Sequence, residues 1–358
     1  MRVCFEVIPY VLSFRFVAGT SRGSFTEKPT WLIRAWQPGQ EAIVGWGEAS
    51  PLKGLSSDYT DDYEARLKAV LAHLEAIEFP DQPDLNFISQ NTPAEMPSVR
   101  FGVETALLDL WHSGEHTPFP GKFAEGSMSI PINGLVWMGE QDFMQQQIDE
   151  KLKQGYNTIK MKVGAIDFAT EVALLERLRD QYTANELTLR VDANGAFTEA
   201  DVREKLEVLA GLEIHSIEQP VKPGQADLMK ALCAETLLPI ALDEELIGVY
   251  EYEAKKALLE SIRPQFIILK PSLVGGFRSC EEWISLAESL GIGWWMTSML
   301  ESNVGLNAIA QFTAQFDPQL PQGLGTGQLY HNNIESPLML KKGRMHYFKN
   351  GSWQQSLG

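Results

Sequence analysis

The sequence predicts an α/β protein: a (β/α)₈ barrel with an N-terminal α+β capping domain. Three observations lead to this prediction. The chain has 358 residues, about the size of a barrel with a modest second domain. From about residue 130 onward, short apolar runs alternate with segments of helical periodicity. Before that point the pattern is that of antiparallel strands followed by helices.

Residues 1–125 are expected to form the capping domain. Strand-like composition appears in the segments FEVIPYVLSFRF, TWLIRAW and AIVGWGEAS. The polar segment 18–29, AGTSRGSFTEKP, is expected to be a loop between the first two strands. Helical spacing of apolar residues follows in DDYEARLKAVLAHLEAIE and PSVRFGVETALLDLWHSG.

Residues 126–330 are expected to form the barrel, because eight apolar runs end at intervals of about 25 to 30 residues. Helix-like segments such as EQDFMQQQIDEKLKQG and TEADVREKLEVLAG follow the runs. The run ends are Gly134, Lys162, Asp192, Glu218, Asp243, Lys270, Ser298 and Gly325. An open doubly wound sheet is the competing architecture, but SIPINGLVWMG lacks its Gly-rich phosphate turn. The last segment, 331–358, is expected to pack back on the capping domain.

Charged side chains stand at five successive strand ends, where active sites of such barrels lie. Side chains alternate between the two faces of a strand. Lys160 and Lys162 therefore share one face of their strand, and Asp192 and Asn194 share one face of the next. If the apolar faces meet the outer helices, the charged groups point into the barrel mouth.

Three acidic strand ends indicate a metal site. Asp192, Glu218 and Asp243 would repel one another without a cation, and their oxygen atoms favour Mg²⁺, with Mn²⁺ as a substitute, over zinc. Lys162 and Lys270 stand on the strands to either side. A lysine near cations and away from water has a lowered pKa and can act as a base. The set predicts removal of a proton next to a carboxylate, with the metal stabilising the enediolate.

Taken singly, these residues have simpler explanations. Asp192 considered alone could equally be the N-cap of a helix. Lys160 and Lys162 considered alone would more simply be a solvent-exposed pair. Five ionisable residues in one register favour the catalytic interpretation. A barrel glycosidase with paired carboxylates is a different class of enzyme, and it predicts activity without metal. A non-enzymatic barrel gives no reason for two lysines facing three acids.

The charge balance bears on partners. With 30 basic and 47 acidic residues the formal net charge is −17, which argues against nucleic acid or an anionic membrane as a partner. A small-molecule carboxylate is the expected ligand, and a homo-oligomer is compatible with the sequence. Glu6 and Pro9 interrupt the first apolar stretch, and no run approaches the roughly 20 apolar residues of a membrane span. A cytoplasmic protein is expected.

The chain resembles the muconate-lactonizing subgroup of the enolase superfamily in the motifs KMKVG, RVDANGAF, IEQP, ALDEE and LKPSLVGG. GWGEASPLKGLS and VRFGVETALLDL extend the resemblance over nearly the whole chain. It implies a modified TIM barrel with a capping domain. Mandelate-racemase relatives carry a histidine on the seventh strand, where this chain has Thr297 and Ser298. Within the subgroup, GLGTGQLYHNN is similar to the o-succinylbenzoate synthase family of menaquinone biosynthesis.

The resemblance implies a Mg²⁺-assisted lyase reaction, the syn-dehydration of 2-succinyl-6-hydroxy-2,4-cyclohexadiene-1-carboxylate to o-succinylbenzoate. Lys162 would remove the α-proton and then protonate the departing hydroxyl. Lys270 would stabilise the enediolate by its charge, and Lys160 would help to hold a carboxylate oxygen. Racemisation of N-succinylamino acids, dipeptide epimerisation and cycloisomerisation share the enediolate and stay open as alternatives.

The substrate contacts are expected on several loops. The resemblance implies that Ser298 and the turn of Gly325, Thr326 and Gly327 meet the substrate's carboxylates. Small residues in this turn expose backbone N–H groups, which suit a carboxylate better than an amine. Asn194 is a further expected contact. Loops around Arg22 and at 52–56 would close over the substrate as a lid.

One motif departs from the subgroup. In SMLES, Thr297 stands for the first residue of the usual serine pair. The sequence leaves the roles of Glu301 and Ser302 open.

Overall fold

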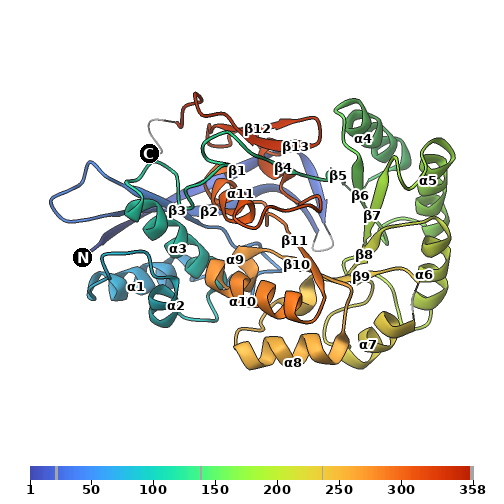
Figure 1. The fold of residues 1–358 in the computed structure, drawn as a ribbon, viewed down its shortest axis with the longest axis horizontal. Helices are drawn as coiled ribbons and strands as arrows, with labels where there is room; N and C mark the ends of the chain where they lie inside the picture. The colour runs from blue at the N-terminus through green and yellow to red at the C-terminus, as the bar shows by residue number, and fades with distance from the viewer. Residues whose placement is uncertain (21–22, 138, 236, 355–358) are drawn as a thin grey trace.

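The computed structural model describes residues 1–20, 23–137, 139–235 and 237–354. Within these ranges the strands form three sheets, which Figure 1 shows in the colours of the chain. The N-terminal sheet lies on one side of the molecule with its helices. A seven-stranded parallel sheet, covered by outer helices, occupies the rest, and a small C-terminal sheet lies beside it.

The N-terminal sheet is antiparallel and consists of β1 (Cys4–Thr20), β2 (Gly23–Trp36) and β3 (Gly45–Ala49). Three helices accompany it: α1 (Tyr63–Glu75), α2 (Leu85–Asn91) and α3 (Pro97–Trp111). Helix α3 is buried along nearly its whole length. It approaches β3 so closely that a Cβ on Gly47 would lie 2.0 Å from the carbonyl oxygen of Gly102. Only glycine fits at this crossing.

The loop expected at 18–29 was wrong. After an irregularity between Ser13 and Ala18, main-chain pairing resumes at Ala18 with Phe25 and Gly19 with Ser24. The hairpin therefore extends to Thr20 and Gly23. The polar composition of this segment did not indicate strands, because main-chain hydrogen bonds hold the hairpin together and do not depend on apolar side chains.

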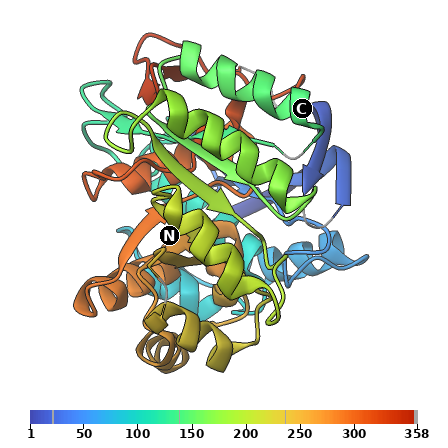
Figure 2. The same cartoon turned by 90° about the vertical axis from the view of Figure 1, so that its right-hand side faces the viewer.

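All neighbouring strands of the seven-stranded sheet are parallel. They are β5 (Gly134–Val136), β6 (Thr158–Lys162), β7 (Thr188–Asp192), β8 (Ser216–Glu218), β9 (Ile240–Leu242), β10 (Phe266–Leu269) and β11 (Gly293–Met296). The helices between and after them are α4 (Gln141–Lys153), α5 (Phe168–Gln181), α6 (Val202–Gly211), α7 (Ala226–Glu235), α8 (Tyr252–Ile262), α9 (Pro271–Val274), α10 (Gly276–Ser289) and α11 (Asn303–Ala314). Figure 2 shows the green to yellow helices following one another around the outside of the curled sheet. None of the described helices is long and apolar enough to cross a membrane.

The strand register aligns the predicted residues. Lys162 pairs with Asp192 across β6 and β7, and Asp192 pairs with Glu218 across β7 and β8. Asp243 and Lys270 directly follow β9 and β10. The alternate residues of β6 and β7, such as Met161 and Val191, are buried in the apolar core with the outer helices. The expected division into a charged and an apolar face is confirmed.

The eighth run differs from the expectation. Gly325 begins the 3₁₀ helix η2 (Gly325–Gln328) instead of ending a strand. The residues before it form single parallel bridges, Gln322 with Ile132 and Gly323 with Thr297. The amide of Gly323 donates to the Met296 carbonyl at 2.7 Å. This short segment thus bonds both to the end of β11 and to the residues just before β5, which are the two edges of the sheet.

The C-terminal segment contacts two parts of the chain. Strands β12 (Leu338–Lys341) and β13 (Arg344–Tyr347) pair with β4 (Ser129–Pro131), which precedes the parallel sheet. Asn332 accepts a hydrogen bond from the Tyr10 hydroxyl of β1 at 2.6 Å through its backbone oxygen. The Trp353 ring stacks on His116 with 4.1 Å between the ring centroids.

Candidate active site

A cavity of about 100 Å³ lies at the carboxyl ends of the parallel strands. The predicted residues that line it are Lys160, Lys162, Asp192, Asn194, Lys270, Ser298, Gly325 and Thr326. Leu52 and Leu55, from the loop expected to act as a lid, also line it. Arg22 lies outside the described residues.

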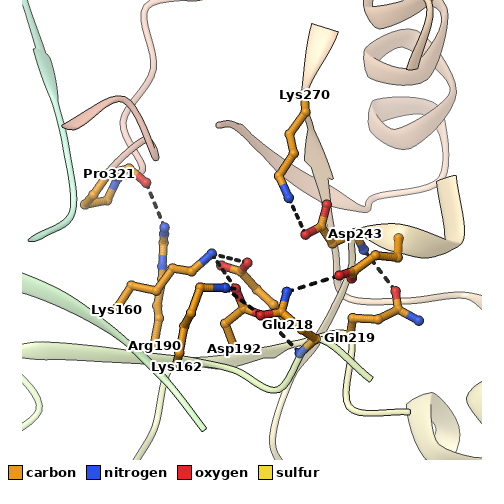
Figure 3. A network of polar contacts seen from close by, with 11 residues as sticks. Lys160, Lys162, Arg190, Asp192, Glu218, Gln219, Asp243, Lys270 and Pro321 are labelled. Carbon is orange, nitrogen blue, oxygen red and sulfur yellow. Dashed lines mark hydrogen bonds and ion pairs between the residues drawn. The ribbon is translucent and has the colours of Figure 1, made fainter. Parts of the chain in front are cut away.

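Two lysines of β6 bind the carboxylate at the end of β7 (Figure 3). The Nζ atoms of Lys160 and Lys162 each lie 3.0 Å from Asp192 Oδ2. Lys160 also donates to the carboxylate of Glu218, and Lys162 donates to the side-chain oxygen of Asn194. Because all of these side chains are buried or nearly so, the ion pairs are shielded from water.

Lys270 meets the carboxylates from a different direction. In Figure 3 it approaches Asp243 from above, whereas Lys160 and Lys162 approach Asp192 from the left. Lys270 Nζ lies 2.5 Å from Asp243 Oδ2. The order predicted from the sequence, with lysines on both sides of the acids, is present in the structure.

The burial of these groups shifts their pKa values. Burial alone would lower the pKa of Lys160, but the charges of Asp192 and Glu218 outweigh it and raise the pKa. For Lys270, the charge of Asp243 likewise outweighs burial and raises the pKa. The lowered pKa expected for a lysine beside a cation stays a prediction, because in this arrangement each ammonium binds a carboxylate directly.

The pKa values of the two carboxylates beside Lys160 are shifted in opposite directions. Burial would raise the pKa of Asp192, but Lys160 and Lys162 hold it well below its usual range. Burial raises the pKa of Glu218 to about 7, and the charge of Asp192 adds to the rise. Asp192 therefore loses its proton at a lower pH than Glu218 does.

The donor set fits a hard cation. Glu218 Oε1 is buried without a hydrogen-bond partner among the described residues. Carboxylate oxygens from three neighbouring strand ends are the ligands that Mg²⁺ prefers. Within the described ranges, no three acidic, histidine or cysteine side chains are grouped closely enough to hold an ion as they stand. Asp192, Glu218 and Asp243 bind lysines in this arrangement, so an ion would compete with ammonium groups for their oxygens.

Glu244 is a cavity residue that the sequence analysis missed. Its Oε1 accepts from the Asn194 side-chain amide at 3.1 Å, and its Oε2 is buried with no partner in the described part of the chain. Burial raises the pKa of Glu244 to about 7, with the charge of Asp243 adding to the rise. The signal was present in ALDEE, where Glu244 directly follows Asp243, but strand alternation gave it no place in the site.

A second polar network lines the cavity near β11. The Ser298 hydroxyl donates to Glu301 Oε2 at 2.5 Å, and the Thr326 hydroxyl donates to Ser298 Oγ at 2.8 Å. Glu301 also accepts from the Ser272 hydroxyl at 2.5 Å. We call Ser272, Ser298, Glu301 and Thr326 the hydroxyl network. It gives Glu301 the role that the sequence left open.

Ser302 connects the barrel strands to the N-terminal sheet. Its hydroxyl donates to Glu48 of β3 at 2.5 Å and accepts from the Val304 amide, which caps helix α11. Glu48 is fully buried and also accepts from the amides of Ser302 at 2.8 Å and Gly305 at 2.9 Å. A residue of the N-terminal sheet therefore satisfies the first turn of α11.

Trp295, the second residue of the tryptophan pair in β11, packs in the interior. Trp295 is fully buried, and the guanidinium carbon of Arg190 lies 4.0 Å from its ring centroid. Arg190 donates to the Pro321 carbonyl at 2.7 Å. Arg190 shares a strand face with Asp192 but is absent from the cavity lining.

The fold and the site define a member of the enolase superfamily, and the chain belongs to it. Residues 144–350, more than half of the chain, match the family described as enolase C-terminal domain-like. The resemblance seen in the motifs is confirmed.

The relatives include enzymes of two activities. The o-succinylbenzoate synthase of Desulfotalea psychrophila is 46% identical over 355 residues, which are 93% of this chain and 95% of that protein. The L-Ala-D/L-Glu epimerase of Bacillus subtilis is 28% identical over 309 residues, covering 83% of this chain and 78% of that protein. The crystal structure of MenC from Desulfotalea psychrophila matches with a TM-score of 0.85 and 41% identity, covering 97% of this chain and 100% of that one.

Proposed function

We propose that the chain is an o-succinylbenzoate synthase, a lyase that dehydrates 2-succinyl-6-hydroxy-2,4-cyclohexadiene-1-carboxylate in the cytoplasm during menaquinone biosynthesis. The 46% identity to the Desulfotalea psychrophila synthase over nearly the full length of both proteins supports this function. The observation that carries the chemistry is that Lys162 and Lys270 line one cavity from opposite sides of the acids.

We further propose a closed barrel of residues 126–330. The bridges of Gln322 and Gly323 to the two edges of the parallel sheet support closure. In this division, residues 1–125 form the capping domain, and 331–358 pack beside it through contacts such as Tyr10 with Asn332.

Asp192, Glu218 and Asp243 would hold Mg²⁺, with Mn²⁺ as a substitute. The orphaned oxygen of Glu218 supports this assignment. When bound, the ion would neutralise the negative charge that develops on the substrate's carboxylate oxygens. It would also displace ammonium groups from the carboxylates, which frees the lysines to face the substrate.

Lys162 is the proposed proton carrier. Its Nζ takes the proton from the α-carbon, and the electron pair of the broken C–H bond moves toward the carboxylate. The electron pair then returns to form the new ring double bond as the C–O bond breaks, and Lys162 gives the same proton to the departing hydroxyl, so that water leaves. Asn194 binds the ammonium of Lys162, which positions the nitrogen at the cavity wall. Lys160 lies beside it and would help to hold a carboxylate oxygen.

Lys270 has a different role in a dehydration. Because syn-elimination needs a base on one face only, Lys270 would keep its proton and stabilise the enediolate by charge. The position of Lys270, across the acids from Lys162, supports this role.

The decisive experiment measures the aromatic product. Purified protein is incubated with the cyclohexadiene substrate and Mg²⁺, and the absorbance of o-succinylbenzoate is followed. We expect turnover that stops on chelation and returns with added Mg²⁺. No product at any metal concentration would contradict the proposed function. Hydrolysis of glycosides after chelation would favour the glycosidase alternative instead.

The second candidate is an epimerase or racemase at the same site. It is favoured by the placement of a lysine on each side of the acids and by the 28% identity to the L-Ala-D/L-Glu epimerase. The relevant test is exchange of the α-hydrogen with deuterated water, using N-succinylamino acids, dipeptides such as L-Ala-L-Glu, and muconate for cycloisomerisation. Exchange and inversion faster than dehydration would make this activity the principal one.

A further inference from the structure

The Ser298 hydroxyl has no hydrogen-bonding capacity left for a ligand. A hydroxyl has one hydrogen to donate and two lone pairs to accept with. Ser298 donates to Glu301 Oε2 at 2.5 Å and accepts from the Thr326 hydroxyl at 2.8 Å and the Leu300 amide at 3.2 Å. Although Ser298 lines the cavity, its polar capacity is filled from within the protein.

The direction of this hydrogen-bond chain is set by Glu301. Its Oε2 accepts from the Met299 amide at 2.6 Å as well as from Ser298, and a backbone N–H cannot reverse its role. With Glu301 ionised, both of its carboxylate oxygens can only accept. It follows that Ser298 must donate to Glu301, and that Thr326 must donate to Ser298. The Thr326 hydroxyl hydrogen points into the protein.

We propose that Thr326 is a specificity-determining residue whose hydroxyl oxygen accepts a hydrogen bond from an O–H or N–H group of the substrate. This inference rests on the proposed function and changes its expected contacts. The hydroxyls of Ser298 and Thr326 donate within the protein and offer no hydrogen to a carboxylate. Only the backbone N–H groups of the turn stay available for that purpose.

The chemistry of the proposed substrate identifies the donor. At neutral pH both of its carboxyl groups are ionised, and its ketone carries no hydrogen. The ring hydroxyl is therefore its one donor, and it is the group that leaves. The product o-succinylbenzoate has no such hydroxyl. Thr326 should thus distinguish substrate from product, holding the hydroxyl before elimination and nothing afterwards.

The test compares substrate and product in two variants. Thr326→Val keeps the shape of the side chain but removes the oxygen, and Thr326→Ser keeps the oxygen. In the valine variant we expect the substrate kcat/KM to fall about three- to tenfold, as for one neutral hydrogen bond. The inhibition constant of added o-succinylbenzoate should stay within about twofold. The serine variant should resemble the wild type.

Two outcomes would overturn the proposal. An equal weakening of substrate and product in Thr326→Val would mean that Thr326 binds a carboxylate, which both molecules share. An unchanged kcat/KM would mean that the oxygen makes no contact. Wild-type turnover, measured first, separates these outcomes from failure of the proposed function. If the wild type forms no product, the function itself is wrong, and the variants are not compared.

A second variant tests the direction of the chain. Ser298→Ala removes the acceptor of the Thr326 hydrogen, so that hydrogen becomes free to turn toward the cavity. We expect o-succinylbenzoate to inhibit this variant several-fold more strongly than the wild type, because its carboxylates gain a donor. Weaker inhibition would show that Ser298 itself contacts a carboxylate, and would contradict the inference.

Discussion

Two walls of the same cavity are built on different principles. The charged wall is lined by Lys160, Lys162, Asp192, Glu244 and Lys270. Glu218 and Asp243 bind Lys160 and Lys270 but do not themselves line the cavity. Two of the buried carboxylate oxygens in this region, on Glu218 and Glu244, have no hydrogen-bond partner among the described residues. In the hydroxyl network, Ser272 and Ser298 donate to Glu301, and Thr326 donates to Ser298.

The difference separates two tasks. An unsaturated cluster of charges can exchange partners, take up an ion and move protons at modest cost. A saturated network resists rearrangement, because breaking any one bond leaves a buried polar group unpaired. The charged wall is therefore suited to chemistry and the hydroxyl network to fixed recognition. Substitutions in the two regions should differ in both kind and size of effect.

Replacing the proton carrier should give the largest effect. In Lys162→Ala we expect kcat for dehydration to fall about 10³-fold, within the range for loss of a general base. The fold should persist, because Asp192 retains its bond to Lys160. Product absorbance measures the rate, and the exposed surface variant Lys230→Ala is the matched control. Activity within tenfold of wild type would remove Lys162 from the mechanism.

Lys270→Arg should have a smaller effect on dehydration. Arginine keeps the positive charge near Asp243 but cannot give up its proton. We expect kcat for dehydration to fall by about tenfold. With N-succinylamino acids or dipeptides as substrates, exchange of the α-hydrogen from both faces of the α-carbon should be lost. Product absorbance and mass-spectrometric deuterium uptake measure the two. If exchange from both faces persists, the two-sided assignment of the lysines is wrong.

The third prediction concerns the pH dependence of stability and Glu104, a buried acid that is not bound by a lysine. Burial raises the pKa of Glu104 to about 8, although the amides of Phe277 and Arg278 donate to it. Between the ordinary Glu value near 4.3 and about 8, the folded state binds one more proton than the unfolded state. Stability should therefore fall as pH rises through this window, by at most about 1.4 kcal/mol per pH unit.

Urea unfolding at pH 5, 6 and 7 measures this dependence. The Glu104→Gln variant cannot titrate and should show a flatter profile over the same range. Identical slopes in the variant and the wild type would show that Glu104 is not the source. Asp192, which Lys160 and Lys162 hold, behaves oppositely, because its pKa is lowered.

The smallest effect is expected where the hydroxyl network adjoins the N-terminal sheet. Ser302→Ala removes the cap of α11 and one donor to Glu48. We expect a loss of about 1 kcal/mol in the free energy of unfolding, as for other N-caps. Because Ser302 lies outside the cavity lining, kcat should stay near the wild-type value. A large loss of activity with unchanged stability would contradict the structural role.

The charged wall could be predicted because its residues interrupt apolar runs at regular intervals. Lys162, Asp192 and Glu218 end their strands as expected, and register alone brings them together. Glu244 escaped because it belongs to the 3₁₀ turn after β9, where strand alternation no longer applies.

The hydroxyl network could not be predicted in the same way. Ser272, Ser298 and Thr326 come from three separate segments, and serine and threonine carry no charge pattern that would connect them. Their hydrogen bonds converge on Glu301, which only the fold brings beside Ser272 and Ser298. Irregular backbone also explains why the eighth run was predicted incorrectly. Two single bridges, at Gln322 and Gly323, stand there in place of a regular apolar strand.

The contact between Glu48 and Ser302 has a consequence for biosynthesis. The two residues are separated by 254 positions, so Glu48 leaves the ribosome long before the helix that it caps. A nascent chain ending near residue 125 would carry this carboxylate without its amide donors. The N-terminal sheet can therefore complete its polar interior only once nearly the entire polypeptide has been translated, which favours maturation of the two halves as one late event.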